Sequence, residues 1–285
     1  MKALYTLKVK NNRGEIMELT HNKRYNVYKI EGLTPPQASI NSSVNTTQDG
    51  SKINSVRLEN RNIVIYLTIE GEVEKNRINL YKYFPPKKDI TLYFKNKSRN
   101  VYIEGTVELI ECDIFANKQI AQISIICGKP YFKDVQSLIS IFSDISPLFE
   151  FPFSIEAEGI ELSTLSTNQR KTIINTGDVD TGIIIELFAL GTVVNPVLYN
   201  VQTAEKMLLN FELQTSDKLI INTNIGEKTI TLLRAGVSYN AMGYMSPDST
   251  WFVLTNGDNL FTYDAERGTS NLQITFKTNL LYSGV

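Results

Sequence analysis

The chain has 285 residues, of which 42% are hydrophobic and 21% charged. This balance is typical of globular proteins, so we expect about two packed domains and no global disorder. Lysines and arginines (29) nearly equal aspartates and glutamates (30), giving a net charge of −1, which argues against sequence-specific nucleic-acid binding and a membrane-surface role. No apolar run approaches the roughly 20 residues that span a bilayer. The first residues lack a signal-peptide core, so we expect synthesis in a cytoplasm.

A long polar stretch between Pro36 and Arg61 is the first notable element. Asp49 and Gly50 lie near its middle and predict a tight hairpin turn, because both central positions of a type I′ turn need positive φ. The flanks, residues 38–47 and 52–58, carry too few apolar residues to bury a face. We therefore expect an extended hairpin arm, which a compact domain keeps when it contacts another molecule.

Short stretches rich in β-branched and aromatic residues predict strands at 63–70, 90–94, 101–109 and 120–126. Val101, Ile103, Val107 and Leu109 alternate onto one face, and Gly105 predicts a bulge or a close backbone approach. A helix is expected over 73–84, with acidic residues at its start and a proline pair at its end.

Apolar residues at helical spacing predict a second helix over 135–145. The two prolines of 147–153 suggest a hinge, and we place the domain boundary near residue 134, giving domains 1–133 and 134–285. Further strands are expected at 183–187, 219–222, 229–233, 251–254 and 272–276. Many short strands at near-regular spacing favour sandwiches or barrels over βαβ units, so the fold class is mainly β.

Catalytic and cofactor motifs are not evident in the sequence. The single histidine, His21, lies among turn residues, where a solvated role is expected over a general base. The two carboxylates of 177–182 lack the spacing of an EF-hand loop, and a turn uses the same residues. Cys112 and Cys127 are expected to be buried free thiols. For Trp251, a role in the core is favoured over a role as a stacking platform for sugars. We expect no enzyme activity, cofactor or metal.

Sequence motifs in order along nearly the whole chain resemble the siphovirus-type tail component family, the phage distal tail proteins. In the first half these are 25–32 (YNVYKIEG) with 33–36 (LTPP), Asp49–Gly50, 61–63 (RNI), Arg77 with Leu80, Tyr81 and Phe84, 103–105 (IEG), 123–127 and 130–132 (PYF). In the second half they are 175–178 (NTGD), 195–196 (NP), 217–223 (DKLIINT), Trp251 with 257–259 (GDN), and 282–285 (YSGV).

This resemblance implies an N-terminal β-sandwich with one helix, which forms a belt or ring domain, and a C-terminal galectin-like β-sandwich. It also implies a homohexameric ring at the distal end of a phage tail, in the virion or in a phage-like particle. The implied partners are the tail tube protein, the tail hub or tail-associated lysin, and receptor-binding or other baseplate proteins. Fold alone does not confer sugar binding, and the chain has no stretch long enough for an inserted carbohydrate-binding module.

We expect the subunit contact to involve the arm, with Asp49, Gly50, Arg57 and Arg61 as candidate interface residues. A ring of identical subunits requires a head-to-tail contact that closes on itself. The alternative function is a carbohydrate-binding module or adhesin that recognises host cell-wall glycans. A wall-degrading hydrolase is a third alternative, for which the sequence shows no nucleophile or metal motif.

Overall fold

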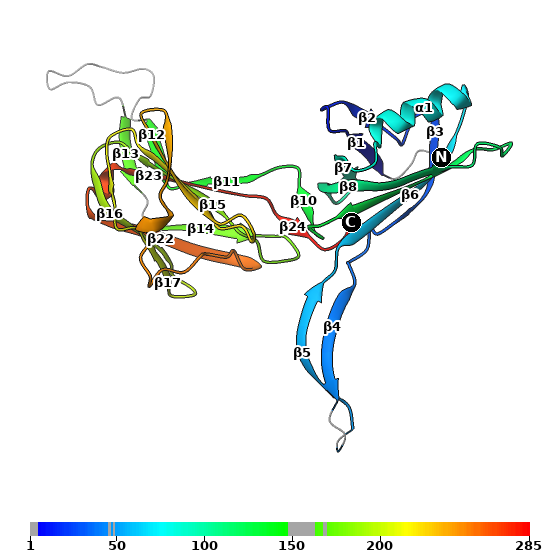
Figure 1. Ribbon diagram of the computed structural model, residues 1–285. Helices are drawn as coiled ribbons and strands as arrows, with labels where there is room; N and C mark the ends of the chain where they lie inside the picture. The colour runs from blue at the N-terminus through cyan, green and yellow to red at the C-terminus, as the bar shows by residue number, and fades with distance from the viewer. Residues whose placement is uncertain (1–4, 45–46, 48, 148–162, 168–169) are drawn as a thin grey trace. The chain divides into compact units, whose positions relative to one another are not determined.

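The computed structural model describes residues 5–44, 47, 49–147, 163–167 and 170–285. The chain divides into two compact units, unit 1 comprising Met1–Val135 with Leu281–Val285, and unit 2 comprising Gln136–Leu280 (Figure 1). Strands dominate both units, which confirms the prediction of a mainly β protein. The suggested hinge at 147–153 falls almost entirely outside the described residues.

Unit 1 is built on a nine-stranded sheet, in which seven strands have the order β2-β1-β7-β8-β9-β6-β3, β10 pairs with β8, and β24 pairs with β10. Its elements are β1 (Thr6–Lys10), β2 (Ile16–Glu18), β3 (Tyr25–Glu31), β4 (Ala38–Val44), β5 (Ser51–Leu58), β6 (Arg61–Ile69), α1 (Val73–Tyr83), β7 (Asp89–Lys95), β8 (Asn100–Cys112), β9 (Ile120–Cys127), β10 (Phe132–Asp134) and β24 (Leu281–Tyr282). The expected helix and the four strands expected before residue 127 are confirmed.

Alternating apolar residues of this sheet and the inner face of α1 form one core. Leu80 and Phe84 from the helical segment pack there with Ile65 and Ile123 from the central strands, all of them fully buried. The hydroxyl of Tyr25 donates to the Asn76 carbonyl (2.9 Å) and so ties the helix to β3. Apolar burial of this kind supplies most of the free energy that stabilises a sheet of this size.

Gly105 lies in the middle of β8, where the prediction of a close backbone approach is confirmed. A Cβ atom there would lie 2.7 Å from Cys127 Sγ and 2.7 Å from Ile125 Cγ2. The register shift lies two residues further on, between Val107 and Leu109. Leu109 therefore leaves the predicted face and is exposed, because a bulge reverses the alternation beyond it.

Unit 2 is a two-layer sandwich with a six-stranded sheet (β11-β23-β15-β19-β20-β21) and a five-stranded sheet (β14-β22-β16-β17, with β18 beside β16). Its elements are β11 (Leu138–Ile141), β12 (Ser143–Pro147), β13 (Ser163–Thr167), β14 (Arg170–Asn175), β15 (Ile184–Ala189), β16 (Val193–Asn200), β17 (Glu205–Leu208), β18 (Glu212–Leu213), β19 (Lys218–Asn222), β20 (Thr229–Arg234), β21 (Val237–Asn240), η1 (Met242–Tyr244), β22 (Gly257–Arg267), η2 (Thr269–Asn271) and β23 (Leu272–Thr278). Phe261 and Phe276 meet across the two sheets at a ring separation of 5.0 Å.

The predicted helix over 135–145 is wrong: β11 and the start of β12 occupy this stretch. β11 pairs antiparallel with β23, from Leu138 opposite Thr278 to Ile141 opposite Thr275. Leu138 and Phe142 are four residues apart, a spacing that a helix face and a strand face share, so the apolar pattern did not discriminate. Ile139 and Ile141 point to the other side and are exposed.

Two further expectations are corrected by the structure. Residues 251–254 do not form a strand, because only Leu254 makes an isolated bridge, to Thr181. The predicted second domain ran to residue 285, but Leu281–Val285 belong to unit 1. The physical reason is that β24 pairs with β10, with Phe132 opposite Tyr282.

Candidate assembly interface

The arm, defined as strands β4 and β5, is a hairpin that pairs only with itself among the described residues (Figure 1). Val44 lies opposite Ser51, so the connection has six residues, 45–50. The predicted hairpin is confirmed, but its turn is longer than the two-residue type I′ turn expected at Asp49–Gly50. Gly50 does adopt a positive φ of 91°, which glycine reaches without steric cost.

A β-bulge sorts the side chains of the arm. The pairing shifts register between Asn41 opposite Ser55 and Ser42 opposite Ile53, which leaves Asn54 as the extra residue of β5. In an unbroken strand, Ile53 and Val56 would point to opposite faces, since they are an odd number of residues apart. The bulge removes this difference and brings Ile53 to the face of Val56.

All apolar side chains of the two strands consequently share one face, and the charged ones lie on the other. The apolar face consists of Ala38, Ile40, Val44, Ile53, Val56 and Leu58, with Ser42 and Ser51. The polar face consists of Ser39, Asn41, Ser43, Lys52, Asn54, Ser55 and Arg57. A hydrogen bond from the Ser43 hydroxyl to Asn54 Oδ1 (3.4 Å) agrees with the placing of Asn54 on the polar face.

The apolar face of the arm is open to solvent. Exposed fractions range from 37% for Leu58 to 75% for Val44, with Ile40, Ile53 and Val56 between them. Burying a Val, Leu or Ile side chain stabilises a protein by about 1.5–3 kcal/mol. A contiguous apolar face on an isolated hairpin therefore marks a surface for another molecule.

The four residues proposed from the sequence do not form one cluster. Asp49 and Gly50 lie exposed in the connection at the tip, and Arg57 is exposed on the polar face of β5. Arg61 is different, because it is only 2% exposed and lies inside unit 1 at the start of β6. Arg61 is therefore not a candidate surface contact. The exposed apolar side chains of the arm, which the sequence did not indicate, are candidates instead.

Arg61 donates only to backbone carbonyls. Its Nε bonds the Pro130 oxygen (2.7 Å), Nη1 bonds those of Gly32 and Thr34 (2.7 Å to Thr34), and Nη2 bonds that of Ser283 (2.6 Å). The guanidinium also stacks over the Phe132 ring at 4.6 Å. Burial lowers the pKa of Arg61 from its ordinary value, and the four carbonyl dipoles with the ring face replace its water shell.

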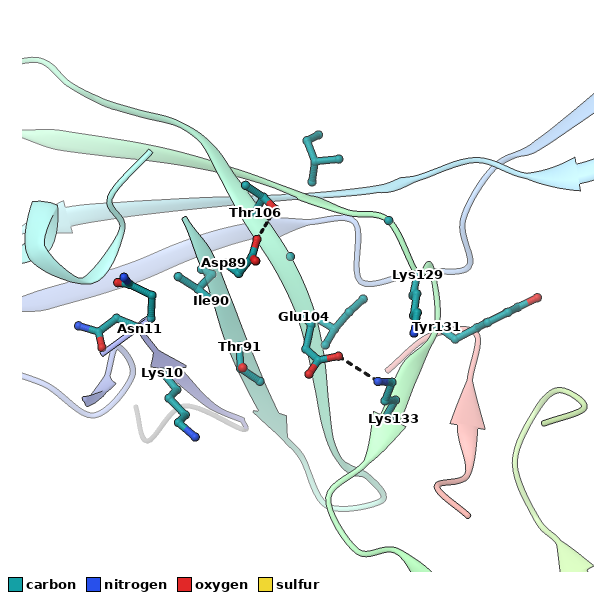
Figure 2. Close-up of a pocket in the computed structure, with 15 residues that line it drawn as sticks. Lys10, Asn11, Asp89, Ile90, Thr91, Glu104, Thr106, Lys129, Tyr131 and Lys133 are labelled. Carbon is teal, nitrogen blue, oxygen red and sulfur yellow. Dashed lines mark hydrogen bonds and ion pairs between the residues drawn. The ribbon is translucent and has the colours of Figure 1, made fainter. Parts of the chain in front are cut away.

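A shallow cavity of about 490 Å³ lies on unit 1 over β7 and β8 (Figure 2). Its carboxylates are engaged within the chain, since Asp89 accepts from the Thr106 hydroxyl (2.6 Å) and Glu104 pairs with Lys133 (2.9 Å). Gly105, Lys10 and Lys129 also line the cavity. The cavity is lined by mixed charges and gives no arrangement of nucleophile, base and oxyanion donor.

The residues that the structure describes show little that resembles a catalytic or metal site. His21 is an exposed turn residue with φ of 56°. Within the described residues, His, Cys, Asp and Glu side chains do not gather in groups of three or more. In the turn 177–182, Asp180 Oδ1 accepts a hydrogen bond from the Asn256 backbone N–H (3.1 Å). None of the described helices has the length and apolar character needed to cross a membrane.

Both cysteines are free thiols, Cys127 buried and Cys112 half-buried. Burial raises the pKa of Cys127 to about 11. Burial also raises the pKa of Cys112, against the lowering effect of its hydrogen bond with Tyr81. Neither thiol is therefore activated as a thiolate nucleophile at neutral pH.

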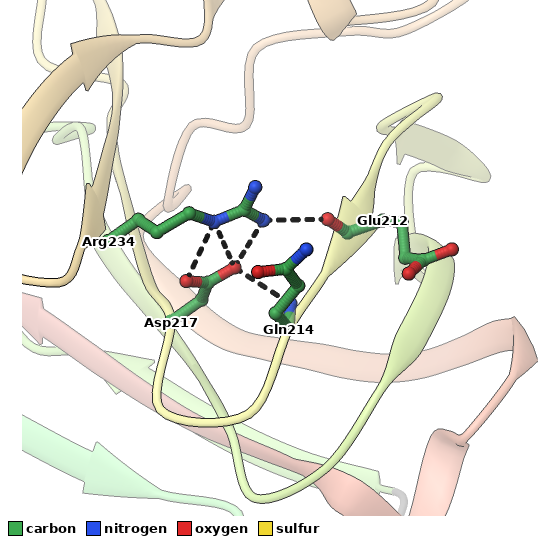
Figure 3. A network of polar contacts seen from close by, with 4 residues as sticks. All are labelled: Glu212, Gln214, Asp217 and Arg234. Atoms are coloured by element: carbon green, nitrogen blue, oxygen red, sulfur yellow. Dashed lines mark hydrogen bonds and ion pairs between the residues drawn. The ribbon is translucent and has the colours of Figure 1, made fainter.

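A charged pair of unit 2 joins Arg234 to Asp217 (Figure 3). Arg234 Nη2 lies 2.5 Å from Asp217 Oδ2, and the Gln214 backbone N–H donates to the same oxygen (2.7 Å). Burial alone would raise the pKa of Asp217, but these hydrogen bonds outweigh it and the pKa is lowered. The pair fixes the turn before β19, and hydrogen bonds within the chain satisfy both charged groups.

Trp251 is half-buried against the core of unit 2, as the sequence suggested. Lys228 Nζ lies 5.5 Å from the centre of its ring. A sugar ring stacks on an open aromatic face, and here a lysine occupies the approach to that ring. Trp251 does not provide a platform that would favour glycan recognition.

Part of the chain is similar to a known protein family. Residues 176–279, which span most of unit 2, match the family model of the siphovirus-type tail component, C-terminal domain. The resemblance expected from the sequence is confirmed by this match. No curated protein matches the sequence.

Solved phage structures share the fold over nearly the whole chain. The Dit protein of phage SPP1, described as a paradigm of the hub adsorption apparatus in phages that infect Gram-positive bacteria, aligns with a TM-score of 0.67 and 11% identity, covering 96% of this chain and 98% of that one. Chains of the phage p2 baseplate in its activated conformation align with TM-scores of 0.53 and 0.51, at 11% and 13% identity. They cover 97% and 96% of this chain, and 98% and 97% of their own.

Proposed function

We propose that the protein is a structural subunit of a phage tail tip, in which unit 1 assembles into a homohexameric ring and unit 2 is a galectin-like sandwich. The family match of residues 176–279 and the fold shared with phage distal tail and baseplate structures support this role. The role is one of assembly, and it needs complementary surfaces and no active site.

The apolar face of the arm is the observation that carries the proposal. In a ring, each subunit presents one surface to the next copy and a different surface to the previous one. An arm with a single apolar face supplies the first of these surfaces, because a neighbouring copy that covers Ile53 and Val56 removes them from water. Asp49, Gly50 and Arg57 would then lie at the margin of the contact.

Further partners follow from the position of such a ring at the distal end of a tail in the virion or a phage-like particle. We propose that it joins the tail tube protein to the tail hub or tail-associated lysin, with receptor-binding or other baseplate proteins around it. The chain would be made in the bacterial host cytoplasm and incorporated there into the tail. The SPP1 protein of similar fold is described as a paradigm of the hub adsorption apparatus, which supports this placement.

Adjacent residues on opposite faces of the arm allow a matched test. Val56→Asp places a charge on the apolar face, and Ser55→Asp places the same charge on the polar face one residue away. Val56→Asp should weaken self-association by roughly 100-fold, since covering a charge would cost several kcal/mol without a partner. Light scattering over a concentration series and negative-stain images of both variants measure the effect.

Ser55→Asp should retain the wild-type rings. Wild-type self-association of both variants would mean that the arm does not dock by its apolar face. Equal loss in both would point to a contact that uses the whole arm, and would contradict the assignment of a single docking face.

A further inference from the structure

The arm leaves the body of unit 1 by two short passages, residues 32–37 and 59–60, which we call the arm root. A backbone hydrogen bond from the Glu59 N–H to the Gln37 carbonyl (3.1 Å) closes the root. Beyond it, β4 and β5 pair only with each other in the described chain. The direction of the arm is consequently set by the conformation of the root.

Arg61 binds this root to two distant parts of the chain. Its guanidinium bonds the carbonyls of Gly32 and Thr34 in the root, of Pro130 before β10, and of Ser283 after β24. We call this arrangement the clasp. Ser283 is 222 residues from Arg61 in the sequence, so the clasp forms only when the segment Leu281–Val285 has returned to unit 1.

The returning segment also lies directly against the root. The Val285 N–H donates to the Leu33 carbonyl (3.1 Å). A Cβ atom on Gly284 would lie 3.1 Å from the Leu33 oxygen and 3.2 Å from Pro35 Cδ, so the two backbones are in close contact. Root and returning segment therefore hold each other in place.

A second arginine secures the returning segment from another side. Arg99 donates to the Gly284 carbonyl, and its guanidinium stacks over the Tyr282 ring at 4.4 Å. β24 adds the antiparallel pairing with β10. The segment is thus held at each of its five residues, from Leu281 to Val285, which suits a strut that supports the root.

We propose that Arg61 is the positioning residue of the arm and that Leu281–Val285 is the strut that it requires. The arm is held in a defined direction when this segment, which follows unit 2 in the chain, is seated in unit 1. The consequence for assembly rests on the proposed function: a copy whose segment is not seated has a loose arm root and docks poorly onto a second copy.

The chemistry of arginine explains why this residue fits the clasp. A guanidinium presents five N–H donors in a planar fork, and here four hydrogen bonds reach three separate segments. A lysine ammonium is a point charge with three donors on a flexible stem, and it cannot reproduce the spread of this fork. Arg61→Lys should therefore keep the charge but lose the coupling.

The experiment compares the full chain with Arg61→Lys, Arg61→Met and a variant that lacks Leu281–Val285. Arg57→Met is the matched control, since Arg57 is an exposed arginine of the same arm. Hydrogen exchange is followed at the Glu59 amide, which reports the root, and at the Val285 amide, which reports the strut. Self-association is measured on the same samples by light scattering.

Both Arg61 variants should raise exchange at Glu59 and Val285 together by at least about tenfold, and weaken self-association by a similar factor. Removing Leu281–Val285 should raise exchange at Glu59 although Arg61 is intact, which keeps the test valid if Arg61→Met does not fold. Arg57→Met should leave both amides unchanged.

Wild-type exchange at Glu59 in the chain that lacks Leu281–Val285 would overturn the proposal, as would wild-type exchange at both amides in Arg61→Lys. If the root loosens in the Arg61 variants and in the chain that lacks Leu281–Val285, but not in Arg57→Met, while self-association is unchanged, the clasp stands and the docking role of the arm is wrong. The two failures are therefore distinguishable.

Discussion

The arm and its root distribute polarity in opposite ways. In the arm, apolar side chains such as Val44 and Ile53 are exposed to water. At the root, a cation, Arg61, is buried and bonded to four carbonyls of its own chain. Each arrangement costs free energy in isolation, because apolar exposure and charge burial are both unfavourable.

The difference separates a surface that needs a partner from a site that is complete. The clasp satisfies its charge within the chain, whereas the apolar face of the arm stays exposed to water. Arg57 and Arg61 show this within four residues of sequence, one exposed on the arm and the other enclosed. Sequence proximity to an interface therefore did not predict membership of it.

The largest difference between arm and root is expected in the free energy of unfolding when the two arginines are truncated one at a time. Arg61→Met should lower the free energy of unfolding of unit 1 by about 4 kcal/mol, since each buried group left unsatisfied costs about 1–3 kcal/mol. Arg57→Met should change it by under about 0.5 kcal/mol, as is usual for exposed positions. Urea unfolding of both variants measures the difference, and equal values would erase the distinction between arm and root.

The second largest effect concerns the bulge that places the apolar side chains of the arm on one face. Inserting one serine between Asn41 and Ser42 gives both strands equal length, removes the bulge and turns Val44 and Ile53 to the polar face. Loss of two apolar contacts of about 1.5 kcal/mol each should weaken self-association by roughly 100-fold. Sedimentation velocity measures it.

Deleting Asn54 is the control for this insertion. It also removes the bulge, but it leaves Ile53 two residues from Val56 and on the same face. Self-association should be kept. Loss of assembly in the deletion variant, with assembly kept in the insertion variant, would reverse the face assignment.

A smaller effect tests how tightly the body of unit 1 is packed in comparison with the open arm. Gly105→Ala places a Cβ atom 2.9 Å from the Ile126 oxygen and closer still to two side chains, so it should destabilise unit 1 by about 2 kcal/mol. Gly128→Ala is the control, because a Cβ atom there meets nothing within 4 Å. Similar thermal unfolding midpoints for the two variants would contradict the packing described for β8.

The smallest effect concerns an ion pair of unit 2, in which the guanidinium of Arg234 faces the carboxylate of Asp217, whereas Arg61 donates only to backbone carbonyls. Asp217 has a lowered folded-state pKa, so its contribution to stability is full above the ordinary value of 3.8 and is lost as the pH falls through the lowered value. Asp217→Asn should destabilise unit 2 by about 1–2 kcal/mol at pH 7 and by less in acid. Urea unfolding at several pH values, with exposed Asp248→Asn as control, tests this. An effect that grows in acid would refute it.

Much of the architecture was predictable because it depends on local patterns. The β-branched and aromatic residues of 63–70 and 120–126 predicted β6 and β9, and the charges and prolines around 73–84 predicted α1. The hairpin at 38–58 was also expected. The prediction of a helix over 135–145 failed because the apolar pattern is ambiguous. The spacing of Leu138 and Phe142 suits both a helix and a strand.

The candidate site was less predictable because it depends on pairing between strands. The arm appeared too poor in apolar residues to have a face, since Ile53 and Val56 are out of phase in the sequence alone. Only the bulge at Asn54 brings them together. Likewise, the burial of Arg61 depends on Ser283 and Pro130, and no local signal in the sequence announces contacts at such separation.

The mass and shape of the purified chain in solution test the central claim most directly. The account predicts a closed particle of six times the 32.2 kDa chain, seen as six-fold rings in negative stain, that dissociates when Val56 is replaced by Asp. A monomer at every concentration, or rings unaffected by that substitution, would contradict it.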